Sequence, residues 1–142
     1  MWCTHKFNRH GIRHETGLSF CTSHIAWECR GIRTGEFPDI MLALSCVTNL
    51  LVDGEFVLAD NGYNDPCVFV NDVKNNPAPR NVMIRQYLAR HESVNKRIRD
   101  FNILRNKFTG NLKFHPRIFH ACVNLVQIQI EHGMPLAESA AA

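Results

Sequence analysis

The sequence has no hydrophobic run long enough to cross a bilayer. Its uncharged stretch at residues 40–52 has 13 residues, whereas a membrane-spanning helix needs about 20 apolar residues. Residues 1–6 contain none of the apolar core that a secretory signal requires. We therefore expect a protein that is not secreted and that has no membrane among its partners.

The six cysteines include no Cys-x-x-Cys pair, and they lie far apart in the sequence. Disulfide frameworks are typical of shorter, secreted chains. Cysteines inside apolar helical stretches, such as Cys46 and Cys122, usually act as small hydrophobic residues. The spacing of the eight histidines and the cysteines matches no zinc finger or ribbon. We therefore expect six reduced thiols and no structural zinc.

What the chain does have is enough apolar sequence for one domain. Its 142 residues are 45% hydrophobic, which is typical of globular proteins. A chain of this length buries about 68–70% of the surface that it exposes when unfolded. We expect a single domain over residues 1–136, followed by a flexible tail at residues 137–142.

Positive charge is concentrated in one part of the chain. Residues 74–117 contain eleven Lys or Arg and two acids, a net charge of +9, whereas the whole chain carries only +3. Clustered cations displace counterions from a phosphate backbone, so this segregation favours a polyanionic partner. A solvated helix face with a few salt bridges has the same composition, and from charge alone both interpretations stay open.

The first part of the sequence predicts a loop, a hairpin and a helix. Residues 1–13 are polar and basic, and we expect a loop there. Two stretches with apolar residues at alternate positions, 14–22 and 24–29, predict a pair of strands joined by a tight turn. Asp39 then lies where a helix N-cap belongs, and the apolar residues 40–51 predict the helix itself.

A short apolar stretch at residues 56–59 predicts a buried strand that ends at Asp60. The next pair, Asn61-Gly62, favours a turn. A carboxylate at the carboxyl end of a core strand lies where open α/β sheets place their chemistry. Asp60 could instead cap this turn through its own side chain, as Asp commonly does. A further apolar piece, residues 67–70, predicts either another strand or the start of a loop.

The remainder of the sequence predicts two helices. Apolar residues recur every three or four positions over residues 80–107, and Gly110 follows where a helix would end. Residues 116–132 show a second helical stretch, which Gly133 and Pro135 terminate. Together the predicted strands and helices indicate an α/β fold.

Three stretches occur in a characteristic order, namely ADNGYNDP from residue 59, ARHESVNKRIRDFNIL from residue 89 and HPRIFHACVNLVQIQIEHGMPL from residue 115. They resemble the C-terminal part of a DDE-superfamily endonuclease of the Harbinger/PIF transposase type, and the resemblance extends over residues 4–136. It implies an RNase H-like fold, a mixed sheet flanked by helices, and metal-dependent cleavage of phosphodiester bonds in DNA. It also implies a nuclear or cytoplasmic protein.

The resemblance assigns catalytic and metal-binding roles to particular acids. In that family an Asp before a Gly-Tyr pair and a Glu on a later basic helix belong to a carboxylate triad that holds Mg²⁺ or Mn²⁺. These positions are Asp60 and Glu92 in this sequence. Asp39 resembles a further acid of the family, and it is either a metal ligand or the helix N-cap described above. The structural alternative for Glu92 is an ion pair with Lys96, one helical turn away.

The family's first strand and its catalytic Asp have no counterpart after Met1. We therefore expect a domain that is truncated at its amino end, marginal in stability, and weak or inactive in cleavage. The two neighbours of the missing strand would keep unpaired edges. The hairpin would have to slide over, residues 1–7 would have to fill the gap, or another chain would have to supply a strand. Alternatively, the natural chain begins further upstream.

The basic segment provides the expected contacts with DNA. Contacts of this kind position nucleic acid without reading its sequence, and a separate DNA-binding protein or a second copy of the chain could supply recognition. The alternative function is a non-catalytic protein that binds nucleic acid or another partner through residues 74–117. The residues expected to contact phosphate are Arg90, Lys96, Arg97, Arg99, Arg105 and Lys107.

Overall fold

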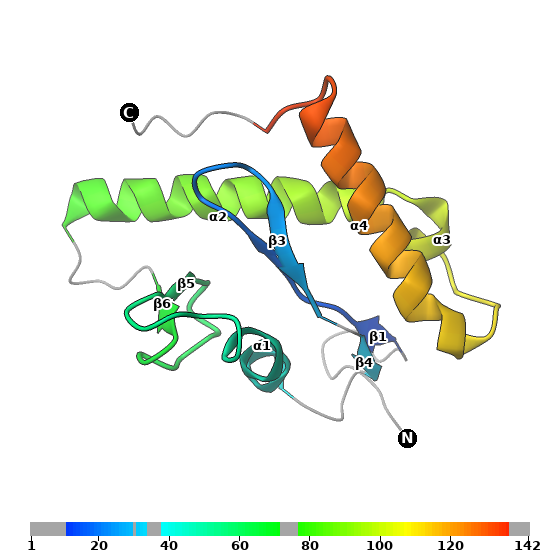
Figure 1. The fold of residues 1–142 in the computed structure, drawn as a ribbon, viewed down its shortest axis with the longest axis horizontal. Coiled ribbons are helices and arrows are strands. Elements are labelled where there is room, and N and C mark those ends of the chain that lie inside the picture. Colours follow the sequence, from blue (N-terminus) through cyan, green and yellow to red (C-terminus); the bar gives the residue numbers. More distant parts are fainter. Residues whose placement is uncertain (1–10, 30, 34–37, 72–76, 137–142) are drawn as a thin grey trace.

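The computed structural model describes residues 11–29, 31–33, 38–71 and 77–136, which have a mixed α/β fold (Figure 1). The α/β class predicted from the sequence is therefore confirmed. None of the helices described is long and apolar enough to span a membrane. In chain order the elements are β1 (Ile12–Arg13), β2 (Thr16–Leu18), β3 (Ile25–Glu28), β4 (Ile32–Arg33), α1 (Asp39–Val47), β5 (Val57–Leu58), β6 (Phe69–Val70), α2 (Ala78–Arg99), α3 (Asn102–Arg105), η1 (Leu112–Phe114) and α4 (His115–Glu131).

The predicted hairpin is present, and it lies in the middle of the molecule. β2 and β3 pair antiparallel, with Thr16 opposite Glu28 and Gly17 opposite Trp27. The turn between the two strands includes Ser23 in the left-handed region, with a φ of 58°. A side chain at position 17 would force the Trp27 ring to move, because a Cβ there would lie 1.9 Å from Nε1 of Trp27.

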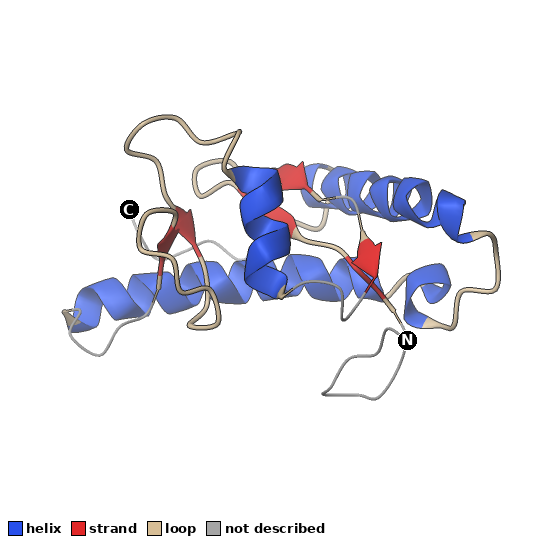
Figure 2. Cartoon of the chain, turned by 90° about the horizontal axis from the view of Figure 1, so that it is seen from below, coloured by secondary structure: helices blue, strands red, loops and turns tan. Residues whose placement is uncertain are grey.

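Two long helices form the larger of two cores. α4 crosses α2, and the hairpin lies along both helices (Figures 1 and 2). The helix predicted over residues 116–132 is confirmed, and it buries four of the apolar residues expected on its inner face. Val126 is completely enclosed. The buried residues of this helix core are Val94, Ile98, Val123, Val126, Ile130 and Leu136.

The helix predicted over residues 80–107 is wrong in its last part. α2 ends at Arg99, and Phe101 has an extended backbone (φ −64°, ψ 121°) before the short helix α3. Phe101 and Leu104 pack against the helix core, and their burial offsets the backbone hydrogen bonds that an unbroken helix would have kept. Tertiary packing, which periodicity does not report, therefore sets the end of α2.

A smaller core lies on the other side of the hairpin and joins α1 to the β5–β6 ladder. β5 and β6 pair in parallel, with Val57 opposite Phe69, so the interpretation of residues 67–70 as a strand is confirmed for its second half. Trp27 of the hairpin packs against this core. Its buried residues, here called the α1 core, are Ala43, Val47, Ala59 and Phe69.

Two predictions about the region around α1 are wrong. Asp39 is the first residue of α1 rather than its N-cap, because Pro38 occupies the cap position, and the Asp39 carboxylate pairs with Nε of Arg13. Cys29 and Cys46 form a disulfide, whereas the sequence predicts six reduced thiols. Their Cα atoms lie 5.8 Å apart, a usual separation for a disulfide, because the end of β3 lies against α1.

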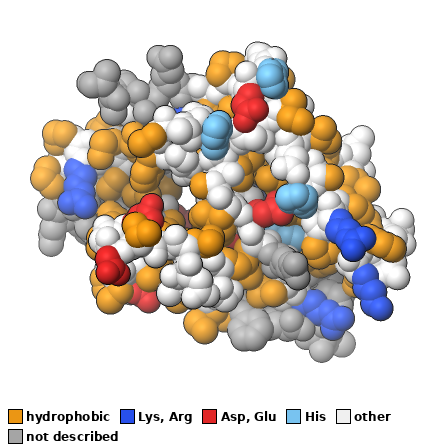
Figure 3. Space-filling view, in the orientation of Figure 1, with side chains coloured by type: hydrophobic (Ala, Val, Ile, Leu, Met, Phe, Trp, Pro, Cys, Tyr) orange, Lys and Arg blue, Asp and Glu red, His pale blue; other side chains and the backbone are white. Residues whose placement is uncertain are grey.

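The strands form three separate ladders of two strands each among the described residues, rather than one mixed sheet. β1 lies within residues 1–13, which were expected to form a loop. Residues 1–10 of that stretch, and the predicted tail at residues 137–142, are outside the described part of the chain. At the open edge of β2, His91 Nε2 donates to the Thr16 carbonyl oxygen at 2.8 Å. Between this edge and β5 lies a cavity, and Figure 3 shows a gap in the surface of this part of the molecule.

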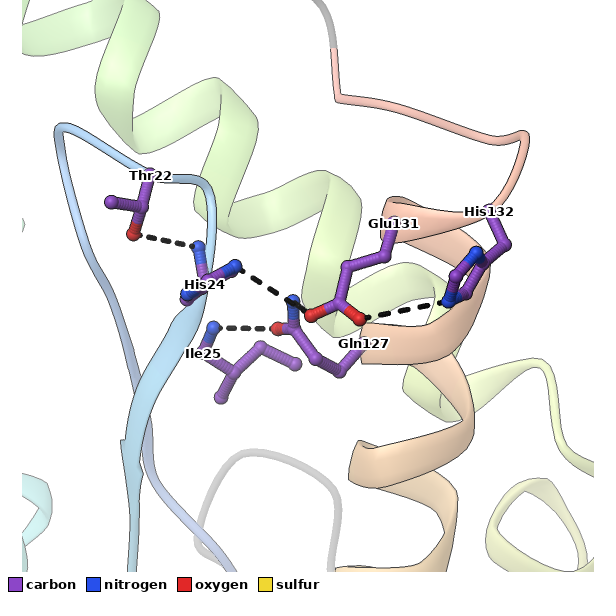
Figure 4. A network of polar contacts seen from close by, with 6 residues as sticks. All are labelled: Thr22, His24, Ile25, Gln127, Glu131 and His132. Atoms are coloured by element: carbon purple, nitrogen blue, oxygen red, sulfur yellow. Dashed lines mark hydrogen bonds and ion pairs between the residues drawn. The ribbon is translucent and has the colours of Figure 1, made fainter.

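Polar contacts attach the hairpin to α4 (Figure 4). The Ile25 N–H donates to Oε1 of Gln127 at 2.8 Å, and Nε2 of His24 lies 3.6 Å from Oε1 of Glu131. Gln127 and Glu131 are one helical turn apart and lie on the same face of α4. The start of β3 is therefore fixed against the last turns of this helix.

Candidate active site and nucleic-acid face

Asp60 directly follows β5 and begins an exposed turn. Its Oδ1 accepts a hydrogen bond from the Gly62 N–H at 2.8 Å, which is the local turn that Asp side chains commonly form. The Asn71 side chain donates to the carbonyl oxygen of Asp60 at 3.1 Å. The turn-capping interpretation of Asp60 is therefore confirmed, and one of its carboxylate oxygens is already engaged.

Glu92 lies in the middle of α2 with an exposed carboxylate. Its Oε1 lies 2.6 Å from Nη2 of Arg99, two turns further along the helix, so the structural partner is not Lys96 as the alternative interpretation predicts. The side chains of Glu92 and Arg99 are 68% and 65% exposed, and ion pairs exposed to this extent contribute only about 0–1 kcal/mol. The fold therefore has little need of Glu92.

Asp60 and Glu92 line the same cavity, which has a volume of about 460 Å³. Its walls come from the β2–β3 hairpin, from β5 and from α2, which supplies Leu88 and His91. The sequence-based expectation that these two acids share one site thus has a geometric counterpart. We call this space the acidic cavity. Asp39, the third predicted metal ligand, does not line it and is paired with Arg13 instead.

Glu15, which sequence reasoning missed, lines the acidic cavity as well. Burial raises the pKa of its carboxyl to about 7, and the negative charges of Asp39 and Asp60 act in the same direction. A hydrogen bond with Tyr63 opposes this rise. Burial therefore favours the protonated form of Glu15. The signal in the sequence is one acid at the start of a strand whose other residues are uncharged.

These acids do not form a metal site. In the part of the chain that the structure describes, no three His, Cys, Asp or Glu side chains are grouped so that they could hold an ion. Asp60 accepts a hydrogen bond from its own turn, and Glu92 is paired with Arg99. Mg²⁺ demands near-ideal octahedral oxygen ligation. The predicted Mg²⁺ or Mn²⁺ therefore has no support in this geometry, and no reaction step is assigned to it.

Two of the predicted phosphate contacts serve the fold instead. Arg90 is 9% exposed, and its guanidinium donates to Oγ of Ser23 in the hairpin turn. Arg97 donates to the carbonyl oxygens of Met134 and Pro135, and so holds the segment that follows α4. Arg90 is therefore not part of the exposed basic face, and the guanidinium of Arg97 is already engaged.

The other predicted phosphate contacts, Lys96, Arg99, Arg105 and Lys107, are exposed. Three of them line a second cavity, with a volume of about 1030 Å³, and Glu92 lines both cavities. Arg105 and Lys107 form no ion pair with any residue that the structure describes. Lys and Arg side chains gather on this end of the molecule, near α3 and the start of α4 (Figure 3). We call this second cavity, of about 1030 Å³, the basic cavity.

Four aromatic rings also line the basic cavity. Phe119 stacks on His14 with ring centroids 3.8 Å apart, and the nearly parallel ring of His115 lies 5.1 Å beyond His14. Nε2 of His14 and Nδ1 of His115 share a hydrogen bond of 3.1 Å. Phe108 then meets His115 edge-on at 5.1 Å. The run of rings is thus continuous from α4 to the loop after α3.

Burial disfavours the charged form of both imidazoles in this run. Burial lowers the pKa of His14 to about 4, and the neighbouring His115 acts in the same direction. A hydrogen bond from Nδ1 of His14 to the Cys29 carbonyl oxygen opposes the shift. Burial also lowers the pKa of His115. The wall of the basic cavity is therefore aromatic, and its positive charge comes mainly from Arg and Lys.

Comparisons of the chain with protein-family models, with curated proteins and with solved structures find no match. The geometry itself is that of two adjoining cavities that share Glu92 along α2. The acidic cavity is lined by three carboxylates, and two of these, Glu15 and Glu92, also line the basic cavity beside its aromatic rings and cations. This pairing can place a phosphate beside acids, but among the described residues the acids do not converge on a single point.

Proposed function

We propose that this chain is a transposase-derived DDE endonuclease domain that has lost all or nearly all cleavage, and that binding of DNA through its basic face is the activity that remains. The observation that carries the proposal is the position of Glu92. It borders the acidic cavity together with Asp60, and it borders the basic cavity together with Arg105 and Lys107. A phosphate backbone in the basic cavity would therefore pass beside Glu92, at the border with the acidic cavity.

The RNase H-like fold is part of the same proposal. A hairpin, then α1, then β5 followed directly by an acid is the order of elements that the resemblance implies. A long basic helix with Glu92 on it follows, and in Figure 1 α2 extends past both the hairpin and the β5–β6 ladder. A nuclear location and recognition of the DNA target by another protein belong to the proposal as well.

Loss of cleavage follows from the state of the acids. Two-metal hydrolysis requires carboxylates that converge and hold ions about 3.5–4 Å apart. Asp60 and Glu92 each have another partner, and the third predicted ligand, Asp39, lies outside the cavity. Phosphate binding has no such requirement, because it depends on cations that displace counterions.

The test combines a nicking assay and a binding assay on the same preparation. We expect supercoiled plasmid incubated with Mg²⁺ or Mn²⁺ to be nicked no faster by the wild-type protein than by the Asp60→Ala variant. We expect both proteins to retard the same DNA in EDTA, with an affinity that falls steeply as salt rises. In a Lys96→Ala variant the slope of log affinity against log salt should fall by about 0.9 for duplex DNA.

Two outcomes would overturn the proposal. Nicking by the wild-type protein that disappears in both Asp60→Ala and Glu92→Gln would show that the acidic cavity still supports catalysis. Absence of any DNA retardation at low salt, in a protein whose circular dichroism shows a folded chain, would remove the binding function.

A further inference from the structure

The basic cavity has features that contact with a duplex backbone does not require. A duplex can be held by exposed cations alone, whereas its bases face inward and cannot stack on protein side chains. Here a run of four aromatic rings forms one wall, and Arg105 and Lys107 lie on the same cavity without ion-pair partners among the described residues. Aromatic rings beside unpaired cations are the combination by which proteins bind single strands.

We propose that the basic cavity binds an unpaired nucleotide of single-stranded DNA, with the base stacked on the aromatic wall at Phe108 and the flanking phosphates at Arg105 and Lys107. The inference rests on the proposed function only in taking DNA as the ligand. It adds that the preferred form is a single strand or a frayed end.

The position of Phe108 supports this assignment. Phe108 is the end of the run of rings, and it lies in the irregular segment between α3 and η1. Its ring is half-buried, so part of it remains open to a ligand. Gly110 allows the ring to take this position, because a Cβ at residue 110 would lie 2.7 Å from Cζ of Phe108. The absence of a side chain at residue 110 therefore leaves room for the Phe108 ring.

The size and charge of the cavity fit the same ligand. Its volume of about 1030 Å³ is at the upper end of the range of about 300–1,000 Å³ for small-molecule sites, so one nucleotide and its phosphates can enter. Arg99 is paired with Glu92 and Arg13 with Asp39, which leaves Arg105 and Lys107 as the cations available for phosphate. Burial disfavours the charged form of both histidines, so the attraction for phosphate comes from these two residues.

The experiment measures binding of labelled DNA by fluorescence anisotropy in EDTA, so that cleavage plays no part. The probes are a single strand of about 12 nucleotides, within the usual site sizes, the corresponding duplex, and an abasic strand of the same length. We expect the wild-type protein to prefer the single strand. In Phe108→Leu, affinity for the single strand should fall about tenfold, the equivalent of one lost base stack, while affinity for the abasic strand should not change.

A pair of matched variants tests the cations. Arg105→Ala with Lys107→Ala removes two charges from the basic cavity, whereas Lys113→Ala with Arg117→Ala removes two charges from neighbouring surface that does not line it. We expect only the first pair to lower the slope of log affinity against log salt by about 1.4 for the single strand. Gly110→Ala should displace the Phe108 ring and reproduce the effect of Phe108→Leu, with an unchanged melting temperature.

The inference is overturned if Phe108→Leu, still folded by circular dichroism, binds all three probes as the wild type does. It is also overturned if the two pairs of charge variants have equal effects, which would indicate diffuse attraction. Either result leaves the proposed function intact as long as the duplex is bound. Failure of the wild-type protein to bind any probe at low salt would contradict the inference and the proposed function together.

Discussion

The helix core and the α1 core differ in the length of the elements that form them. The helix core is built from α2 and α4, two elements long enough to bury several side chains each, and it includes Val126, which is completely enclosed. The α1 core is built from a nine-residue helix and strands of two residues. The helix core therefore contains more of the buried residues, while Asp60 directly follows a strand of the smaller α1 core.

The hairpin lies between the two cores, and two consecutive residues just before β2 contact different parts of the molecule. His14 stacks on Phe119 of α4 and borders the basic cavity. Glu15 bonds to Tyr63 of the turn after β5 and also borders the acidic cavity. His14 thus belongs to the aromatic wall, whereas Glu15 lies at the border of both cavities, where burial favours the protonated form of its carboxyl.

The largest expected effect comes from placing a carboxylate in each core. Val126→Asp puts an unpaired charge in the centre of the helix core, at a cost of several kcal/mol, about the size of a whole domain's stability. We expect no cooperative thermal transition for this variant. Val47→Asp, at an equally enclosed position in the α1 core, should leave a transition and the helical circular dichroism of α2 and α4.

If Val47→Asp also abolishes the transition, the two cores fold as one unit, and the contrast between them does not extend to stability.

Next in size is removal of the disulfide. Cys46→Ser opens the link between β3 and α1, which joins residues 17 positions apart. The loss of a constraint of this length costs about 3 kcal/mol. We expect this loss in a denaturant titration under oxidising conditions, with Cys67→Ser as the control, because Cys67 is an exposed free cysteine. Equal stability of Cys46→Ser and the wild type would mean that the α1 core does not depend on the link.

A smaller effect is expected where the hairpin meets the α1 core. Gly17→Ala places a Cβ against the ring of Trp27, and overpacking of this kind costs about 1–3 kcal/mol. The cost should shrink when Trp27→Leu is present as well, which a double-mutant cycle by denaturant titration measures. Additive effects of the two substitutions would show that the Trp27 ring does not limit position 17.

The last comparison concerns opposite pH dependences, which are expected from the two neighbouring residues His14 and Glu15. The pKa of Glu15 is raised from 4.5 to about 7 in the folded protein, so its contribution to stability is present below pH 4.5 and is lost as pH rises through 7. The pKa of His14 is lowered from 6.5 to about 4, so its contribution is present above pH 6.5 and is lost as pH falls through 4.

Substitutions separate the two contributions. Glu15→Gln should remove the loss of stability between pH 4.5 and 7, and His14→Gln should remove the gain between pH 4 and 6.5. Denaturant midpoints measured across pH 4 to 8 give both slopes, and Tyr87→Phe, away from both cavities, serves as the control. A slope that is unchanged by Glu15→Gln would contradict the raised pKa of its carboxyl.

The elements with a strong sequence pattern were the most predictable. Alternation and helical periodicity predict the hairpin and α4, and both are present. The catalytic site of Asp60 and Glu92 that the resemblance implies stays a prediction, although both residues line the acidic cavity. The end of α2 and the Cys29–Cys46 disulfide were not predictable, because each depends on which distant residue packs opposite.

The basic cavity was predictable from the sequence only in part. Arg105 and Lys107 were expected to face nucleic acid from their charge, but the ring contacts join residues far apart in sequence. His14 meets His115 and Phe119 only because the hairpin lies along α4. Arg90 shows the converse, because a cation on a predicted basic face is used to hold the hairpin turn.

The most direct test of the central claim is an amide NMR titration of the ¹⁵N-labelled protein with Mg²⁺, followed by the short single strand. We predict that Mg²⁺ alone leaves the signals of Gly62 and Glu92 unchanged, and that the strand then shifts the signals of Lys107, Phe108 and Gly110. Saturable shifts of the Gly62 and Glu92 signals with Mg²⁺, in the absence of shifts around Phe108 with DNA, would contradict the claim that the protein binds DNA but no longer cleaves it.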